Sequence, residues 1–280
     1  MRAYAPAVRA RATVIMAAAV LAVSGETTIA RAEPPQAQMR FEPEIDVTVS
    51  IFAGAAWLVT ELDKRQLAPD ECRLCDRKPN GLDASARRAF LWKSPETAAG
   101  LSNLGVFGLA PVSALGLSAL AAWHDHRQQN IPADAVLIVQ ASLLAMDLNQ
   151  LTKFASGRAR PYVRFDNRAV LDGEPDRHDA HLSFFSGHTT AAFALAASSG
   201  TVATLRRYRW APWVWAQGLA IGFFSGYLRI AADRHYLTDV LAGAAMGAAV
   251  GFAVPFLHRP GRSFTVGPVA GPGLGIVGTW

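Results

Sequence analysis

Cysteine is scarce in this chain: it has two, Cys72 and Cys75, with two residues between them. A zinc site would need two further ligands nearby, and the surrounding sequence offers none. A thioredoxin-like redox site is also disfavoured, because the strand–helix context of that motif is missing. In an exported protein such a pair forms a small local bridge, so we predict a structural disulfide between Cys72 and Cys75.

Charge is also sparse, at 18% of the 280 residues, whereas hydrophobic residues make up 51%. The net charge is nevertheless +5, because 27 Lys and Arg outnumber 22 Asp and Glu. The arginines flank apolar segments and are not interleaved with aromatic residues. This pattern argues against a nucleic-acid partner and favours a membrane surface or anionic phosphates. The length allows one or two domains, and no internal repeat is present.

The N-terminal apolar run, Val14 to Val23, is shorter than the roughly 20 residues that a membrane span needs. It follows three arginines within the first eleven residues and precedes Ala30-Arg31-Ala32, an A-x-A cleavage pattern. We therefore expect residues 1–32 to be a cleaved secretory signal. The alternative is an uncleaved anchor helix.

Six apolar segments predict helices: 46–62, which is marginal as a span, and approximately 98–123, 133–155, 187–205, 212–230 and 236–257. Small residues are common in them, which permits close helix packing in lipid. We therefore predict an all-α bundle of about six helices, embedded in a membrane. It would consist of an N-terminal segment (33–95), a helical core (96–258) and a Gly-rich, irregular or β-like tail (259–280).

Three short motifs in the second half of the chain point to one chemistry. They are Lys153 with Arg160-Pro161, then Ser186-Gly187-His188, then Arg229, His235 and Asp239. His235 and Asp239 are four residues apart, so on a helix they share a face. A carboxylate on Nδ1–H fixes the imidazole tautomer and leaves Nε2 free as a nucleophile for phosphorus. His188 would protonate the leaving oxygen and later activate water.

The remaining motif residues are suited to holding an anion. Lys153, Arg160 and Arg229 would bind the oxygens of a transferring phosphoryl group. Ser186 and Gly187 stand where a helix is predicted to begin, so that backbone N–H groups would face the phosphate. The scheme requires no metal and no other cofactor. Each motif alone is weak, but the three together predict hydrolysis of a phosphate ester.

The motifs resemble those of the type 2 phosphatidic acid phosphatase superfamily, K-x(6)-R-P, P-S-G-H and S-R-x(5)-H-x(3)-D. That group includes lipid phosphate phosphatases, bacterial non-specific acid phosphatases and vanadium-dependent haloperoxidases. The resemblance spans about residues 95–257. Phe185 stands in place of Pro and Leu228 in place of Ser. Neither change removes a catalytic atom of the family's scheme, but the Leu228 change removes a hydroxyl that could help to hold phosphate.

The loop 157–183 is long and rich in arginine, and we expect it to cap the site. His178 and His181 within it are predicted to be solvated, and His124 and His126, at a predicted helix end, to be exposed. None of the four is predicted to be a ligand.

The helix order places all three motifs at one end of the bundle and Arg206, Arg207, Arg209 and Arg259 at the other. The positive-inside rule then makes the arginine end cytoplasmic and turns the site to the periplasm. A span at 46–62 after a cleaved signal would put the site in the cytoplasm instead. Either 46–62 does not cross the membrane, or no helix crosses and the chain is a soluble exported bundle.

The sequence therefore predicts an exported inner-membrane phosphatase with a periplasm-facing site, acting on a phosphorylated lipid or isoprenoid diphosphate through a phosphohistidine. Phosphatidic acid, phosphatidylglycerol phosphate, undecaprenyl diphosphate and lipid A phosphates are all compatible substrates. The alternatives are a soluble periplasmic acid phosphatase of broad specificity, a vanadate-dependent haloperoxidase and a non-catalytic membrane scaffold.

Overall fold

The computed structural model describes residues 39–69, 72–73, 80–166, 177–259, 263–268 and 274–279. Contacts separate Met1–Gln36 from the unit Ala37–Trp280, to which all the described residues belong. The predicted signal, residues 1–32, lies outside the described part. Cys72 is disulfide-bonded, but Cys75 also lies outside it, so their pairing stays a prediction.

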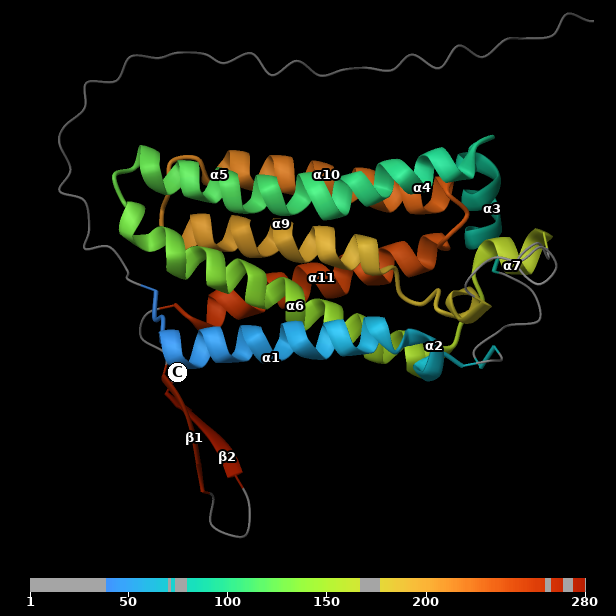
Figure 1. The fold of residues 1–280 in the computed structure, drawn as a ribbon. Coiled ribbons are helices and arrows are strands. Elements are labelled where there is room, and N and C mark those ends of the chain that lie inside the picture. Colours follow the sequence, from blue (N-terminus) through green and yellow to red (C-terminus); the bar gives the residue numbers. More distant parts are fainter. Residues whose placement is uncertain are drawn as a thin grey trace, which may run out of the picture. The chain divides into compact units, whose positions relative to one another are not determined.

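Six long helices run side by side (Figure 1), which confirms the predicted all-α bundle. They are α1 (Pro43–Leu62), α5 (Ala110–His124), α6 (Ile131–Ser156), α9 (Gly187–Leu205), α10 (Ala211–Ala231) and α11 (Leu237–Leu257). Helix α4 (Pro95–Leu104) continues through the π-helical η1 (Gly105–Leu109) into α5. Proline in the first turn begins α1, α4, α6 and α10, where its missing N–H costs no hydrogen bond.

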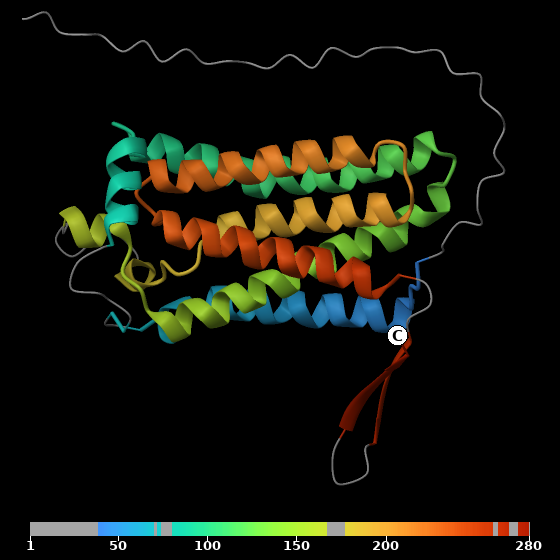
Figure 2. The same ribbon diagram turned by 180° about the vertical axis from the view of Figure 1, so that it is seen from behind.

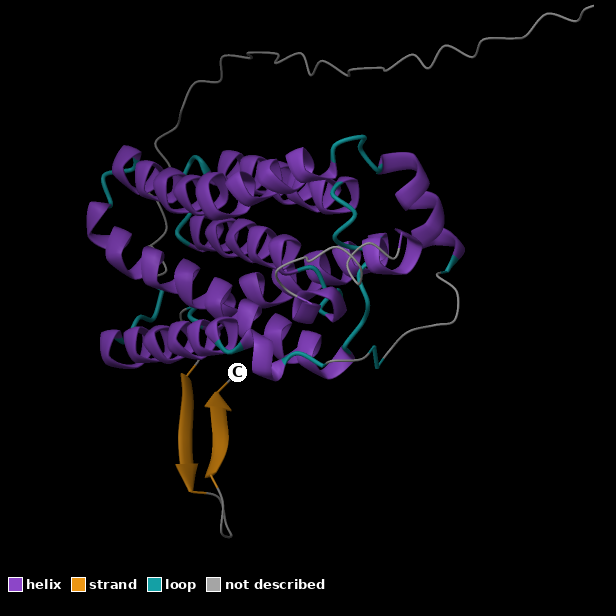
Figure 3. Ribbon diagram, turned by 45° about the vertical axis from the view of Figure 1, so that its right-hand side comes forward, coloured by secondary structure: helices purple, strands orange, loops and turns teal. Residues whose placement is uncertain are grey.

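The shorter elements are α2 (Lys64–Leu67), α3 (Gly81–Phe90), η2 (Gln128–Asn130), α7 (Pro161–Asp166) and η3 (Arg177–His181). In the tail, β1 (Ser263–Pro268) pairs with β2 (Leu274–Thr279) in an antiparallel hairpin, with Ser263 opposite Thr279. Figure 3 shows this hairpin in orange as the β-structure among the described residues, in agreement with the predicted β-like tail.

Helix α9 forms the centre of the bundle, with α11 and α10 packed on it (Figure 2). Its residues from Thr189 to Ala203 are all buried. The approach is close because glycines at every fourth position face it, namely Gly243, Gly247 and Gly251 of α11 and Gly218, Gly222 and Gly226 of α10. Such small-residue stripes are typical of helices that associate in lipid, where backbones must come near one another.

The outer surface of the bundle is apolar. Four helical stretches are long and apolar enough to cross a membrane: Pro43–Leu62, Pro95–His124, Gln128–Phe165 and Leu237–Leu257. Large hydrophobic side chains lie exposed on them and on α10, for example Phe52, Val112 and Trp213. An apolar surface of this extent needs lipid around it, so the chain is a membrane protein.

Helix α1 packs along the bundle, and its length makes it a candidate span. Its start lies where α11 ends, because Arg40 N donates to the His258 carbonyl at 2.7 Å and His258 Nε2 lies 3.0 Å from Asp46 Oδ1. Further along, buried Gln140 of α6 donates to the Asp46 carbonyl at 3.2 Å. The C-terminal end of α1 therefore reaches the opposite end of the bundle, where α6 ends and α9 begins.

Candidate functional site

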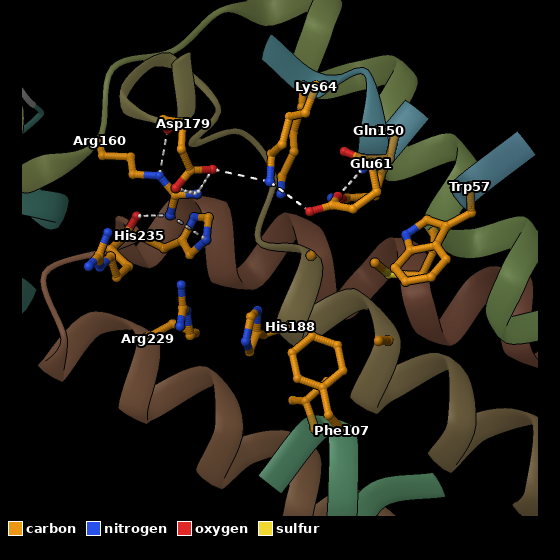
Figure 4. A pocket seen from close by; sticks show the side chains of 17 residues that line it. Trp57, Glu61, Lys64, Phe107, Gln150, Arg160, Asp179, His188, Arg229 and His235 are labelled. Atoms are coloured by element: carbon orange, nitrogen blue, oxygen red, sulfur yellow. Dashed lines mark hydrogen bonds and ion pairs between the residues drawn. The ribbon is translucent and has the colours of Figure 1, made fainter. Parts of the chain in front are cut away.

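A cavity of about 320 Å³ opens at this end of the bundle. Its lining includes six of the predicted site residues, Lys153, Arg160, Gly187, His188, Arg229 and His235 (Figure 4). Four different segments bring them together: the end of α6 and the turn after it, the start of α9, the end of α10, and the turn before α11. Ser186 and Asp239 do not line the cavity and lie behind its wall.

His235 is 2% exposed and is held at both ring nitrogens. Its Nδ1 lies 2.8 Å from the Ser183 carbonyl, which only accepts, so Nδ1 must bear the proton. Nε2 is then unprotonated and accepts from Arg160 Nη1 at 3.2 Å. The tautomer is therefore the one that a nucleophilic Nε2 requires. Burial, and then the charges of Arg160 and Arg229, lower the pKa of His235 well below its ordinary value.

Asp239 supports His235 less directly than the sequence suggests. Its Oδ2 is 3.6 Å from His235 Nδ1, within ion-pair range, while the hydrogen bond at Nδ1 goes to Ser183. The same carboxylate accepts from Ser183 Oγ at 2.5 Å and from Tyr236 N at 3.0 Å. Asp239 thus holds the Ser183 residue whose carbonyl orients the imidazole.

Arg158 is the partner of Asp239 that the sequence analysis missed. Its Nη1 lies 2.5 Å from Asp239 Oδ1, and its Nη2 lies 3.0 Å from Asp83 Oδ2. Asp83 of α3 also accepts from the backbone N–H of Thr238, at the start of α11. Both carboxylate side chains are fully buried. Arg158 stood out in the sequence only as one arginine of the capping loop, and nothing there linked it to Asp83.

Arg160 is fixed by protein groups at most of its donors. Nε donates to the Asp179 carbonyl at 2.8 Å, Nη1 to the Arg234 carbonyl at 3.0 Å, and Nη2 to the Asp179 carboxylate at 2.8 Å. Burial alone would raise the pKa of Asp179, but the charges of Arg160, Lys64 and Lys153 hold it well below its usual range. The second Nη1 hydrogen of Arg160 is donated to His235. Arg160 can therefore bind a ligand through two N–H groups, as predicted, only if some of these hydrogen bonds rearrange.

Arg229 is better placed than Arg160 to donate hydrogen bonds to an anion. It is 7% exposed, and its Nε is buried without a hydrogen-bond partner among the described residues. Lys153, also 7% exposed, lines the same cavity. A buried cation whose donors are unsatisfied is costly, so the cavity favours an anionic ligand at this point.

Gly187 is required by the approach of two side chains to the start of α9. A Cβ at this position would lie 2.9 Å from Asn149 Oδ1 and 3.2 Å from Lys153 Nζ. Any larger residue would push the ammonium group away. Ser186 caps the helix instead of facing the cavity, because its Oγ accepts from Thr189 N at 3.4 Å and it is fully buried.

His188 lies opposite His235 and is oriented from α4. Its Nε2 is 2.7 Å from Asn103 Oδ1, and because an amide oxygen only accepts, Nε2 is the donor. The ring of Phe107 packs edge-on against the imidazole, with centroids 5.2 Å apart. Asn103 was not identified from the sequence, where it is one polar residue in an apolar segment.

Leu228, His124, His126 and His181 do not line the cavity. Leu228 is fully buried in an apolar cluster with Ala98 and Ala231. His181 Nδ1 lies 3.3 Å from the Pro69 carbonyl, so this histidine is partly buried and not freely solvated. His124 and His126 are exposed, as predicted. The side chain of His178 lies outside the described part.

A second cavity, of about 240 Å³, adjoins the first. The two share Trp57, Val106, Phe107, Met146 and Ala191 in their linings. The second continues between α1, α5, α6 and α9 and is lined almost entirely by apolar side chains. A polar, cation-lined cavity thus lies next to an apolar one among the candidate membrane spans.

Known proteins are similar to parts of this chain. The PAP2 superfamily matches residues 134–260, a range that contains all three motifs. The lipid A 1-phosphatase of Porphyromonas gingivalis is 37% identical over 99 residues, which are 35% of this chain and 18% of that relative. The match therefore covers less than a fifth of that relative's length.

Among solved structures, the transmembrane PAP2-type phosphatidylglycerolphosphate phosphatase of Bacillus subtilis is similar over 76% of this chain and 94% of that chain. The TM-score is 0.45 and the identity 17%. The family match covers residues 134–260, under half of the chain, and these residues hold the three motifs, so this region is similar to the PAP2 superfamily.

Proposed function

We propose that this protein is a phosphatase that removes phosphate from a lipid-linked substrate through a phosphohistidine intermediate. The observation that supports it most is the pairing of the two cavities. One presents the buried Nε of Arg229, which has no hydrogen-bond partner in the described part of the chain, beside His235 and His188, and the other lies next to it and is apolar. A phosphate ester with a hydrocarbon chain would satisfy both.

In the first step His235 Nε2 attacks phosphorus and the ester P–O bond breaks. His188 enters this step as the imidazolium, and it gives the proton that it carries besides the Nε2–H on Asn103 to the leaving oxygen. In the second step His188 takes a proton from water, which attacks phosphorus and breaks the P–N bond, so that inorganic phosphate leaves and His235 is restored. Arg229 and Lys153 hold the phosphoryl oxygens. The hydrogen bond that Arg160 Nη1 donates to His235 Nε2 moves to a phosphate oxygen as the reaction begins.

The similarity to a lipid A 1-phosphatase supports a lipid substrate. The alternative is a soluble acid phosphatase, which would use the same motifs. The apolar second cavity and the four candidate spans favour the lipid reading over that alternative. Extraction separates the two: the protein should require detergent, and release by salt alone would favour the soluble enzyme.

We also propose that the site faces the periplasm. Arg127, Arg206, Arg207 and Arg209 lie at the end of the bundle away from the cavity, and the positive-inside rule makes that end cytoplasmic. With α1 crossing the membrane, this orientation puts the start of α1 on the cytoplasmic side, whereas a cleaved signal or an N-terminal anchor span would put it outside. Arg209 is largely exposed, so a cysteine from Arg209→Cys should react with an impermeant maleimide only in opened cells. Reaction in intact spheroplasts would contradict the orientation.

Phosphate release by the detergent-solubilised protein tests the proposed function directly. A lipid phosphate, an isoprenoid diphosphate and p-nitrophenyl phosphate would be compared. His235→Ala should lower the rate roughly a thousandfold or more, while His124→Ala, an exposed histidine at the far end, should not. His188→Ala should still form phosphoenzyme from p-nitrophenyl phosphate, whose leaving group needs no acid.

Near-normal turnover by His235→Ala would overturn the nucleophile assignment. Activity should also survive EDTA, and a loss restored by zinc or magnesium would contradict the scheme. A folded protein that releases phosphate from none of the substrates would favour the non-catalytic scaffold.

A further inference from the structure

The wall of the cavity across from His235 and Arg229 has two unsatisfied polar atoms of its own. Trp57 Nε1 and Gln150 Oε1 are both buried, and neither has a hydrogen-bond partner among the described residues. Figure 4 shows Trp57, Glu61 and Gln150 grouped on this side, apart from the catalytic histidines. Trp57 and Glu61 belong to α1, which precedes the family match at residues 134–260.

The orientation of the Gln150 amide is fixed by a chain of polar contacts. Its Nε2 donates to Glu61 Oε2 at 2.6 Å, so Oε1 is the atom left without a donor. Glu61 is held in turn by Lys64 Nζ at 3.1 Å, and Lys64 lies 3.4 Å from Asp179, the partner of Arg160. The unsatisfied carbonyl is therefore part of an ordered wall, and Gln150 is 2% exposed.

The two atoms differ in what they need, and this difference identifies the ligand. The indole N–H only donates and the amide oxygen only accepts. A phosphate or carboxylate would satisfy Trp57 and be repelled by Gln150, whereas an ammonium would do the reverse. A neutral group that both accepts and donates, a hydroxyl or an amide, satisfies both.

The position of this wall indicates which part of a substrate would reach it. Trp57 lines both the cation-lined cavity and the apolar cavity, so it stands between the place for phosphate and the place for a hydrocarbon chain. We propose that Trp57 and Gln150 form a subsite for a neutral hydroxyl or amide on the leaving group, next to the scissile ester. The proposal rests on the phosphatase function above.

The subsite narrows the substrate class. A leaving group built on glycerol or a sugar, with a free hydroxyl or an amide near the phosphate, fills it. A diacylglycerol with both hydroxyls esterified, or a prenyl chain, leaves Gln150 Oε1 without a donor. An unsatisfied buried acceptor carries the full cost of its desolvation, so substrates of the second kind should be discriminated against.

Matched synthetic substrates test the subsite. They are 1-O-dodecylglycerol 3-phosphate, its 2-deoxy analogue and its 2-acetamido analogue, in mixed micelles with the purified full chain. The wild-type protein should have a kcat/KM for the hydroxyl or the acetamido substrate roughly 5- to 100-fold above that for the deoxy compound. The ranking of the two identifies which group the wall accepts.

Trp57→Phe removes the N–H and keeps an aromatic ring, and Gln150→Leu removes the acceptor. Both should bring the ratio towards one, whereas Trp213→Phe, on the exposed surface of α10, should keep the wild-type ratio. A wild-type ratio of one with good turnover would overturn the subsite and leave the phosphatase standing. No turnover of any of the three substrates would overturn both.

Discussion

Removal of Arg158 should damage both the stability and the activity of this protein. The Arg158→Leu change deletes a guanidinium that lies 2.5 Å from Asp239 and 3.0 Å from Asp83. It also removes the cation stacked 4.2 Å above the Tyr236 ring. The two carboxylate side chains are fully buried and would lose their shared countercharge.

Breaking a buried pair from one side costs about 3–5 kcal/mol. The lower end applies here, because Asp239 keeps Ser183 Oγ and Tyr236 N, and Asp83 keeps two donors from Thr238. We therefore expect a loss of about 3 kcal/mol in the free energy of unfolding. Activity should fall as well, since a shift of about 1 Å in a positioned group costs roughly 100-fold. The shift would pass from Asp239 through Ser183 to His235.

Denaturant unfolding in detergent and kcat for phosphate release measure the two effects. Arg158→Lys should be intermediate, because one ammonium cannot fork between two carboxylates. Adding Asp83→Asn to Arg158→Leu should recover part of the stability by removing one unpaired charge. Arg88→Leu is the control, because Arg88 is exposed on α3 and bonds to Ser85. Wild-type stability and kcat in Arg158→Leu would refute the reasoning.

Two further predictions concern protonation and packing. Because burial and neighbouring cations lower the pKa of His235, its imidazole should be neutral at pH 7 and stay neutral below pH 6.5. The imidazole ¹⁵N chemical shifts, assigned by comparison with His235→Ala, measure this titration. A titration midpoint of His235 at or above pH 6.5 would contradict the prediction. Gly247→Ala should lower the free energy of unfolding by about 1–3 kcal/mol, because its Cβ would overlap the Thr190 carbonyl oxygen. Gly116→Ala in α5 is the control, because a Cβ at this position would have open space around it. This change should be neutral or should raise the free energy of unfolding by up to about 1 kcal/mol. Equal effects of the two changes would show that the loss in Gly247→Ala does not come from packing on α9.

The helices and their order were predictable, because apolar runs with proline at the start and polar turns between them specify helices locally. The convergence of the three motifs followed from the same order, since α6 and α10 must end where α9 and α11 begin. The marginal segment 46–62 was harder to interpret. Its composition does not show whether it packs on the bundle. The contacts of Asp46 with Gln140 and His258 show that it does, and its length also makes it a candidate span.

The roles of single residues near the site were less predictable. The spacing of His235 and Asp239 suggested a direct hydrogen bond, but the helix begins at Leu237, after His235, so the carboxylate turns to Ser183 and the carbonyl of Ser183 takes its place. Helical spacing applies only when both residues are in the helix.

The sequence by itself determined the resemblance to the family, the all-α fold and the groups that we propose attack and bind a phosphate, because these depend on local periodicity and residue type. The tertiary structure alone decided which buried charges face one another. Arg158 meets Asp83 across 75 positions of the chain, and Gln150 meets Glu61 across 89. Long-range pairing depends on how the helices pack, and no local pattern records it.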